Sequence, residues 1–251
     1  AVLCALLVLG GLGFTVIGEL SRSLKPRNWS FHTKVVMATT AILLMGGTAL
    51  IWLSEYTSQS MFVHMPWYER GAQALFLSVT ARTAGFATFD LSKLGSATLL
   101  FMILLMFIGA SPNSTGGGVK TTTFAALLLS MASTLSGKRD VTLFGRRMPV
   151  EAIRRATAIS LLAGMWIAGA LILLTLAEPA IDFIKLFFEV VSAFGTVGLS
   201  TGITPHLNPP ARIVLMLTMF AGRVGLLTLL LALTPREPAE IRYPEAPLSV
   251  G

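Results

Sequence analysis

The stretch SAFGTVGLSTG, Ser192 to Gly202, places a Thr-Val-Gly turn and small hydroxyl residues between Phe-rich apolar segments. A glycine-rich turn at membrane depth is tolerated only where its backbone is buried in protein or lines a water-filled path, because unpaired backbone groups are costly in lipid. The stretch therefore predicts a structured turn beside an aqueous path, provided that the flanking segments lie in a membrane.

The composition of the chain indicates a membrane protein. Of its 251 residues, 54% are hydrophobic and only 12% are charged, whereas soluble domains carry about 25% charged residues. The net charge of +7 comes from short loops between apolar runs, which is typical of cytoplasmic loops rather than of nucleic-acid binding. The single Cys4 excludes an internal disulfide framework. The chain is apolar from residue 1 with no basic n-region, so we expect it to begin in mid-fold, as a fragment would.

The apolar segments predict an all-α polytopic fold. A helix that crosses a bilayer needs about 20 mostly apolar residues. Two shorter apolar segments, 71–80 and 183–194, suit re-entrant half-helices. The segments predicted to cross are 35–53, 94–119, 121–135, 156–177 and 213–234. The last of them is broken only by Arg223.

Basic residues mark one side of the membrane. The loops 22–34 and 136–155 are rich in Lys and Arg, whereas the connections 54–70 and 178–185 are mixed or acidic. The positive-inside rule places the two basic loops in the cytoplasm. Each unit then consists of an outward helix, a short dipping helix, an extended turn and an inward helix.

An internal repeat connects the opening stretch to an earlier one. With an offset of 198 − 85 = 113 residues, TAGF (residues 83–86) aligns with TVGL (196–199), and Met106-Phe107 aligns with Met219-Phe220 without a gap. Gly10–Gly13 matches the pattern of Gly222–Gly225, which makes the start of the chain the last helix of an earlier unit. Parallel repeats about an axis along the membrane normal would surround that axis with equivalent turns.

Such turns could bind a cation through their backbone. Carbonyl groups of Thr-Val-Gly turns replace the hydration shell of K⁺ in potassium channels. Glycine reaches backbone conformations that other residues avoid, so that carbonyls can face the ion. The repeat therefore predicts a potassium filter, with a plain re-entrant turn that binds no ion as the alternative.

The motifs resemble those of the pore subunits of the Trk/Ktr/HKT potassium transporters, with KtrB-like members the most similar. The resemblance rests on TARTAGF (80–86), IGASPNSTGGGVKTTTF (108–124), SAFGTVGLSTGIT (192–204) and MFAGRVG (219–225). Family members carry four M1–pore–M2 units in one chain. The resemblance thus implies that residues 1–20 are the M2 helix of an earlier unit, that 33–137 and 150–235 are the third and fourth units, and that 236–251 form a cytosolic tail.

The resemblance also implies the site residues. The predicted ion-binding residues are Thr83, Ala84, Gly85, Phe86, Thr196, Val197, Gly198 and Leu199, with K⁺ held at 83–85 and 196–198. Residues 109–120 are predicted to form an intramembrane gating loop beneath the filter. The predicted gating residues are Gly109, Ser111, Pro112, Asn113, Ser114, Thr115, Gly116, Gly117, Gly118, Lys120 and Arg223.

The gating loop can also be deduced from its residues. Pro112 and the three consecutive glycines 116–118 would unwind a helix, and the segment aligns with the interior of the last inward helix. The alternatives are an ordinary connection between two spanning helices and a nucleotide-binding P-loop. The P-loop is disfavoured because Val119 separates Gly118 from Lys120 and an apolar helix, not a strand, precedes the loop.

Three further residues attract attention. Arg223 lies within an apolar helix, where a charge costs at least about 2.5–3.5 kcal/mol in lipid, so we expect it to face the gating loop; snorkelling to the interface is the alternative. Arg82 precedes the filter and could brace it, with Glu189 as a candidate partner. Leu226 replaces a proline usual in KtrB-like chains, which should straighten that helix.

These observations favour potassium uptake across a bacterial cell membrane by a multi-pass protein that is not an enzyme. A sodium-permeable or sodium-coupled relative and a non-transporting subunit remain alternatives; no Ser/His/Asp or Glu/His constellation appears in the spans. The resemblance implies a homodimer that meets a cytosolic nucleotide-binding ring of RCK type (KtrA-like). This chain itself is expected to bind potassium, with sodium as an alternative, and membrane lipid, but no nucleotide and no nucleic acid. It lacks two of the four filter turns, so it should not close a pore alone.

Overall fold

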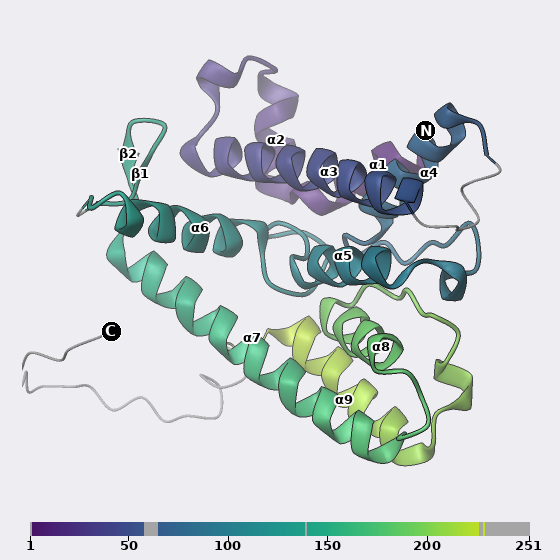
Figure 1. Cartoon of the computed structure of the whole chain (residues 1–251). Coiled ribbons are helices and arrows are strands. Elements are labelled where there is room, and N and C mark those ends of the chain that lie inside the picture. The colour runs from purple at the N-terminus through teal and green to yellow at the C-terminus, as the bar shows by residue number, and fades with distance from the viewer. Residues whose placement is uncertain (1, 58–64, 139, 226–227, 229–251) are drawn as a thin grey trace, which may run out of the picture.

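The computed structural model describes residues 2–57, 65–138, 140–225 and 228. As predicted, the described part is built of α-helices, with one short hairpin in addition (Figure 1). The elements are α1 (Val2–Leu12), α2 (Phe14–Arg22), η1 (Pro26–Asn28), α3 (Phe31–Thr57), α4 (Trp67–Thr80), η3 (Leu91–Lys93), α5 (Ser96–Phe107), α6 (Thr121–Leu135), β1 (Thr142–Leu143), β2 (Arg146–Arg147), α7 (Val150–Ala177), α8 (Phe183–Gly195), η4 (Thr204–His206) and α9 (Pro209–Val224).

Two helices of the described part, α3 and α7, are long and apolar enough to cross a membrane alone. They contain the spans predicted over 35–53 and 156–177. Helices α1 and α2 pass the same test only as a pair, which bends by 108°. The segment 1–20, predicted to be the M2 helix of an earlier unit, thus consists of α1 and most of α2, with a turn at Gly13 (φ 88°) between them.

The predicted segment 121–135 is one helix, α6, but two other predicted spans are interrupted. The span over 94–119 is helical only in α5, which ends at Phe107. The span over 213–234 is helical in α9 as far as Val224, where Gly225 (φ 86°) caps the helix. Leu226 was expected to straighten this segment, but α9 ends before it; Leu226 and the predicted tail, 236–251, lie outside the described residues.

The offset of 113 residues is also present in the structure. The 3-10 helix η3 begins at Leu91 and η4 at Thr204, so that 204 − 91 = 113. Helices α5 and α9 begin at Ser96 and Pro209, again 113 residues apart. The backbone thus repeats in the register that the sequence alignment predicts.

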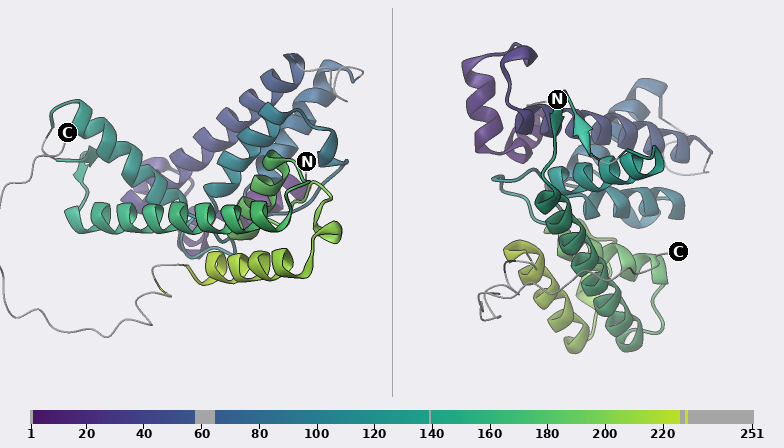
Figure 2. Two further views of the ribbon diagram at one scale, coloured as in Figure 1. Left: turned by 60° about the horizontal axis from the view of Figure 1, so that its bottom comes forward. Right: turned by 90° about the vertical axis from the view of Figure 1, so that its left-hand side faces the viewer.

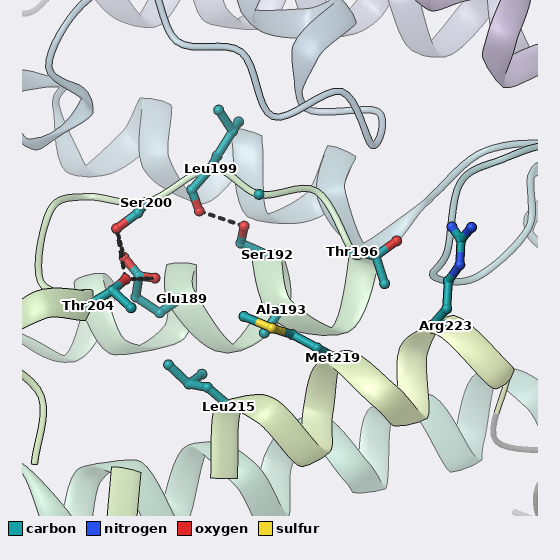
Figure 3. A pocket seen from close by; sticks show the side chains of 11 residues that line it. Glu189, Ser192, Ala193, Thr196, Leu199, Ser200, Thr204, Leu215, Met219 and Arg223 are labelled. Atoms are coloured by element: carbon teal, nitrogen blue, oxygen red, sulfur yellow. Dashed lines mark hydrogen bonds between the residues drawn. The ribbon is translucent and has the colours of Figure 1, made fainter. Parts of the chain in front are cut away.

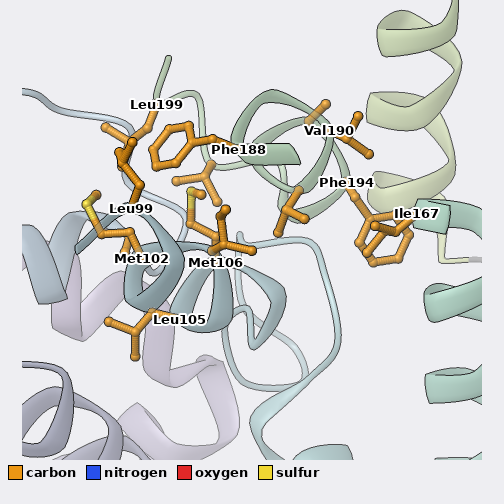
Figure 4. Close-up of a cluster of buried hydrophobic side chains, with 14 of the residues drawn as sticks. Leu99, Met102, Leu105, Met106, Ile167, Phe188, Val190, Phe194 and Leu199 are labelled. Atoms are coloured by element: carbon orange, nitrogen blue, oxygen red, sulfur yellow. The ribbon is translucent and has the colours of Figure 1, made fainter. Parts of the chain in front are cut away.

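The helices form two groups that meet at α5 and α8. Helix α3 packs against α4 and α5, whereas α7 and α9 pack against α8; in the right-hand view of Figure 2 the group α7–α9 lies below α1–α5. Between them, Met102 and Met106 of α5 face Phe188 of α8, all fully buried (Figure 4). This contact fixes the turn after α8 beside the turn after α4.

The two basic loops lie at the same end of the helices (Figure 1). One connects α2 to α3, and the other contains the hairpin, in which Thr142 pairs with Arg147. Phe144 and Gly145, both at positive φ, form the tip of the hairpin. The positive-inside rule, applied to the loops 22–34 and 136–155, requires both loops to lie at the same end of the helices.

Candidate functional site

Helix α8 ends in the turn of the SAFGTVGLSTG stretch, which follows Gly195. Thr196 has a left-handed backbone at φ 52°, and Gly198 follows at φ 89°. The amide of Val197 donates to the Ser192 carbonyl at 2.9 Å, which folds the turn back onto the last turn of α8. Because residues with a Cβ rarely adopt such φ values, the position of Gly198 suits glycine.

Helix α4 ends in an equivalent turn. Thr83, the repeat partner of Thr196, has φ 66°, and Gly85 has φ 75°. The amide of Ala84 donates to the carbonyl of Thr80, the last residue of α4, at 3.1 Å. Both turns therefore have positive φ at the Thr and Gly positions, although the acceptors of these amide hydrogen bonds, Thr80 and Ser192, differ by one position in the alignment.

The two turns meet at their glycines. A Cβ added to Gly85 would overlap the Val197 carbonyl oxygen and lie 3.3 Å from the Cα of Gly198. A Cβ added to Gly198 would lie 3.6 Å from the Cα of Gly85, an ordinary contact. Only glycine at residue 85 lets the two backbones approach this closely.

Hydroxyl groups hold the far end of each turn. Thr80 donates its hydroxyl to the Phe86 carbonyl at 2.6 Å, and Ser192 donates to the Leu199 carbonyl at 2.6 Å. Phe86 and Leu199 are repeat partners, but the two donors differ by one position in the alignment. These two carbonyl oxygens consequently lie on the side of the helices α4 and α8.

Residues 108–120 form the predicted non-helical loop between α5 and α6. Ile108 and Val119 form a parallel bridge at its neck, where the Gly109 amide donates to the Val119 carbonyl at 2.9 Å. A turn at Pro112 and Asn113 leads the chain back. The loop therefore has a closed neck and an ordered backbone.

The loop lies against the first residue of both turns. The Gly117 amide donates to the Thr196 hydroxyl at 3.0 Å. A Cβ added to the preceding Gly116 would overlap the Thr83 hydroxyl. The consecutive glycines 116 and 117 thus allow the loop to contact two repeat partners at once.

Two cationic side chains bind neighbouring carbonyls of the loop. Arg223 donates to the Thr115 carbonyl from α9, and Lys120 donates to the Gly116 carbonyl from within the loop. Arg223 is exposed among the described residues. Its guanidinium does lie beside the loop.

The opposite side of the loop is bonded to the break between α1 and α2. The Ser111 amide donates to the Gly11 carbonyl at 3.0 Å, and the Phe14 amide donates to the Asn113 carbonyl at 3.1 Å. The bend at Gly13 frees the backbone groups that make this seam. The sequence did not indicate that the loop would pair with residues 11 and 14. The alignment of Gly13 with Gly225 was the one signal that a helix break could occur at Gly13.

Arg82 and Glu189 do not form the predicted pair. Glu189 accepts hydrogen bonds from Ser200, Thr201 and Thr204 instead. The Nε of Arg82 is buried and has no hydrogen-bond partner among the described residues. Glu189 is therefore not the partner of Arg82, a role for which it was only a candidate.

A cavity of about 570 Å³ lies along the turn after α8 (Figure 3). Polar groups of Glu189, Ser192 and Ser200 line one end, and Thr196 and Arg223 line the other. The cavity thus extends along the turn from the Glu189 cluster to the loop side. Among the described residues, no group of three or more His, Cys, Asp and Glu side chains could hold a metal ion.

Comparison with known proteins provides the family. Residues 1–240 match the family model "TrkH: Cation transport protein". Ktr system potassium uptake protein B of Vibrio alginolyticus is 39% identical over 252 residues, an alignment that covers 99% of this chain and 55% of that protein. The protein of the same name from Bacillus subtilis is 34% identical over 250 residues, covering 100% and 56%. Potassium/sodium uptake protein NtpJ of Enterococcus hirae is 36% identical over 258 residues, also covering 100% and 56%.

A solved structure shares the fold. The crystal structure of the potassium transporter TrkH from Vibrio parahaemolyticus superposes with a TM-score of 0.74 at 20% identity, covering 92% of this chain and 51% of that one. The chain spans about half the length of the curated relatives described above. Sequence and fold together show that it belongs to the TrkH family of cation transport proteins.

Proposed function

We propose that the chain contributes two filter turns and a gating loop to a potassium-uptake pore. The observation that carries the proposal is the meeting of two repeat-related, left-handed turns at Gly85 and Gly198. The relatives named above are potassium or potassium/sodium uptake proteins, which describes transport rather than catalysis.

The backbone carbonyls at 83–85 and 196–198 are the proposed ion ligands. Such oxygens can replace the water shell of K⁺. The carbonyls of Phe86 and Leu199 already accept hydroxyl hydrogen bonds. These two carbonyls are better suited to fixing the turns than to binding the ion. We therefore leave Phe86 and Leu199 out of the proposed ligand set.

The loop 109–120 is the proposed gate. It contacts Thr83 and Thr196, the first residue of each turn, so it lies at one end of the proposed filter. It is held from one side by Gly11 and Phe14 and from the other by Arg223. An ion that leaves the filter at this end would require the loop to move.

Potassium is the proposed ion, and sodium is the alternative. In the family that the motifs resemble, serine in place of a filter glycine marks sodium permeability, and this chain has Gly85 and Gly198. One relative is nevertheless named a potassium/sodium uptake protein. Selectivity therefore has to be measured rather than inferred from the family.

The proposed architecture follows the repeat. Residues 33–137 and 150–235 are the third and fourth M1–pore–M2 units of a multi-pass protein in a bacterial cell membrane, and 1–20 end an earlier unit. The basic loops at one end of the helices are the proposed contact with a cytosolic RCK-type ring, in an assembly of two copies. Two of the relatives are named as proteins of a Ktr system.

The gate is tested by removing the positive charge of Arg223. In the complete protein, Arg223→Gln should raise potassium uptake about fivefold without changing ion preference. A unit charge about 4 Å from the ion opposes it by about 1 kcal/mol in water and about 4 kcal/mol at an effective dielectric near 20; the exposure of Arg223 favours the lower figure. The measurement is the initial rate of uptake by cells that lack other potassium transporters.

Arg212→Gln is the matched control. Arg212 lies at the opposite end of α9 and donates to the Pro205 carbonyl, away from the loop. Its substitution should leave the rate unchanged. Equal rates for wild type and Arg223→Gln, at equal amounts of protein in the membrane, would make Arg223 a simple anchor.

A further inference from the structure

A buried carboxylate holds the chain that follows the filter turn of the fourth unit. Glu189 of α8 is only 5% exposed. Its Oε1 accepts from the Ser200 hydroxyl at 2.6 Å and from the Thr201 amide at 3.0 Å, and its Oε2 accepts from the Thr204 hydroxyl at 2.9 Å (Figure 3). Hydrogen bonds to an ionised acceptor are about twice as strong as neutral ones.

This carboxylate has no cationic partner in the described part of the chain. The two ion pairs formed there join Arg147 to Asp140 and Arg155 to Glu151, all in the basic loop and the start of α7. The charge of Glu189 is therefore compensated by neutral donors that all belong to residues 200–204. It connects α8 to the segment directly after Gly198.

The cavity makes this connection important for the shape of the filter turn. Gly198, Leu199 and Ser200 all line the cavity of about 570 Å³, so side-chain packing does not enclose this part of the turn on that side. Hydrogen bonds to α8 must supply the restraint instead. Ser192 holds the Leu199 carbonyl, and Glu189 holds the next two residues.

The third unit has no carboxylate at the position equivalent to Glu189. The repeat partner of Glu189 is Phe76, since 189 − 113 = 76, and the partner of Ser200 is Ala87. There, the exposed Thr88, the partner of Thr201, donates instead to the amide oxygen of the half-buried Gln73 at 3.0 Å. One of the two turns is thus held by a buried carboxylate and the other by a neutral surface contact.

We propose that Glu189 is a positioning residue that sets ion selectivity through the fourth filter turn. Its carboxylate fixes residues 200–201 against α8 and so fixes the direction of the Val197 and Gly198 carbonyls before them. The proposal rests on the function proposed above. It also places one negative charge behind one turn only, so the two turns are not equivalent in their response to substitution.

The test compares Glu189→Gln, Glu189→Asp and Glu189→Ala in the complete protein, with the ratio of K⁺ to Na⁺ uptake as the readout. Glu189→Ala should lower the ratio about tenfold, the equivalent of one lost hydrogen bond to a charged group. Glu189→Gln can accept from Thr201 but turns an NH₂ group toward Thr204, so its ratio should be intermediate. Glu189→Asp keeps the charge and should recover most of the ratio.

Hydrogen exchange of the Thr201 amide provides a readout that does not depend on transport. Its exchange should accelerate at least about tenfold in Glu189→Ala, because the carboxylate is its acceptor. Gln73→Ala is the matched control in the third unit and should leave both readouts unchanged. Should Glu189→Ala fold poorly, Glu189→Gln provides the same two measurements.

The outcomes separate this proposal from the filter assignment. If Gly198→Ser changes the uptake ratio but all three Glu189 variants keep it, Glu189 has no positioning role and the proposal is overturned. If Gly198→Ser and Gly85→Ser also leave the ratio unchanged, the filter assignment itself fails. Faster exchange at Thr201 with an unaltered ratio would show a structural contact alone, which also contradicts the proposal.

Discussion

Substituting Gly198 with serine is expected to reduce the preference for potassium over sodium at least about tenfold, which corresponds to about 1.4 kcal/mol of lost discrimination. Gly198 has φ 89°, a conformation that costs a residue with a Cβ of order 1–3 kcal/mol. Its neighbour Gly85 lies at an ordinary contact distance, so serine fits, but the strain should rotate the carbonyl groups of the turn. The measurement is competitive uptake of K⁺ and Na⁺ by the complete protein.

Gly85→Ser should have the larger effect of the two. There the added Cβ overlaps the Val197 carbonyl oxygen, so the opposite turn must move as well. Gly145→Ser is the control, because Gly145 also has positive φ (72°) but lies at the tip of the hairpin with open space around it. An unchanged ratio in both filter variants would contradict the filter assignment.

Deleting Ser114, Thr115 and Gly116 should raise potassium flux by about an order of magnitude and leave ion preference similar. The deletion removes the carbonyls bound by Arg223 and Lys120 and the contact with Thr83. It spares the neck, where Ile108 pairs with Val119. A tenfold rise requires the gate to contribute only about 1.4 kcal/mol to the barrier. The measurement of this rise in flux is the initial uptake rate at saturating potassium.

The Arg223→Gln variant distinguishes a gate from general loosening. In the deletion background the Thr115 carbonyl is gone, so Arg223→Gln should add much less than it does in the wild type. If the effects of Arg223→Gln and of the deletion on flux were fully additive, Arg223 would act at a site other than the loop. A flux that falls to background in the deletion variant, with the protein present in the membrane, would contradict the gating role.

Much of the fold could be predicted from the sequence because the repeat has no gap. The offset of 113 residues placed Gly85 opposite Gly198 and the helices α5 and α9 in register. The unwinding of residues 109–120 also followed from local chemistry, because proline and consecutive glycines disfavour a helix in any context.

The bend at Gly13 and the end of α9 before Gly225 could not be predicted in the same way. A single glycine in an apolar run is compatible with a continuous helix. At Gly13 the bend exposes backbone groups that pair with Ser111 and Asn113, about a hundred residues away in the chain. A contact of that range leaves no local pattern, although the matching glycines in two units were an indication.

Glu189 shows a similar limit. From the sequence it was a candidate partner for Arg82, since opposite charges in apolar surroundings are usually paired. The structure satisfies it with hydroxyl and amide donors from the segment directly after Gly198 instead. Ser and Thr residues after a glycine turn therefore deserved consideration as partners for a carboxylate on the preceding helix.

The most direct test of the central claim is to locate the ion. In crystals of the complete protein soaked with Tl⁺, an anomalous scatterer that replaces K⁺, the account predicts signal between the two turns, within coordination distance of carbonyls at 83–85 and 196–198. The signal should weaken in Gly198→Ser crystals. Strong signal elsewhere with none between Gly85 and Gly198 would contradict the claim that these turns form the filter.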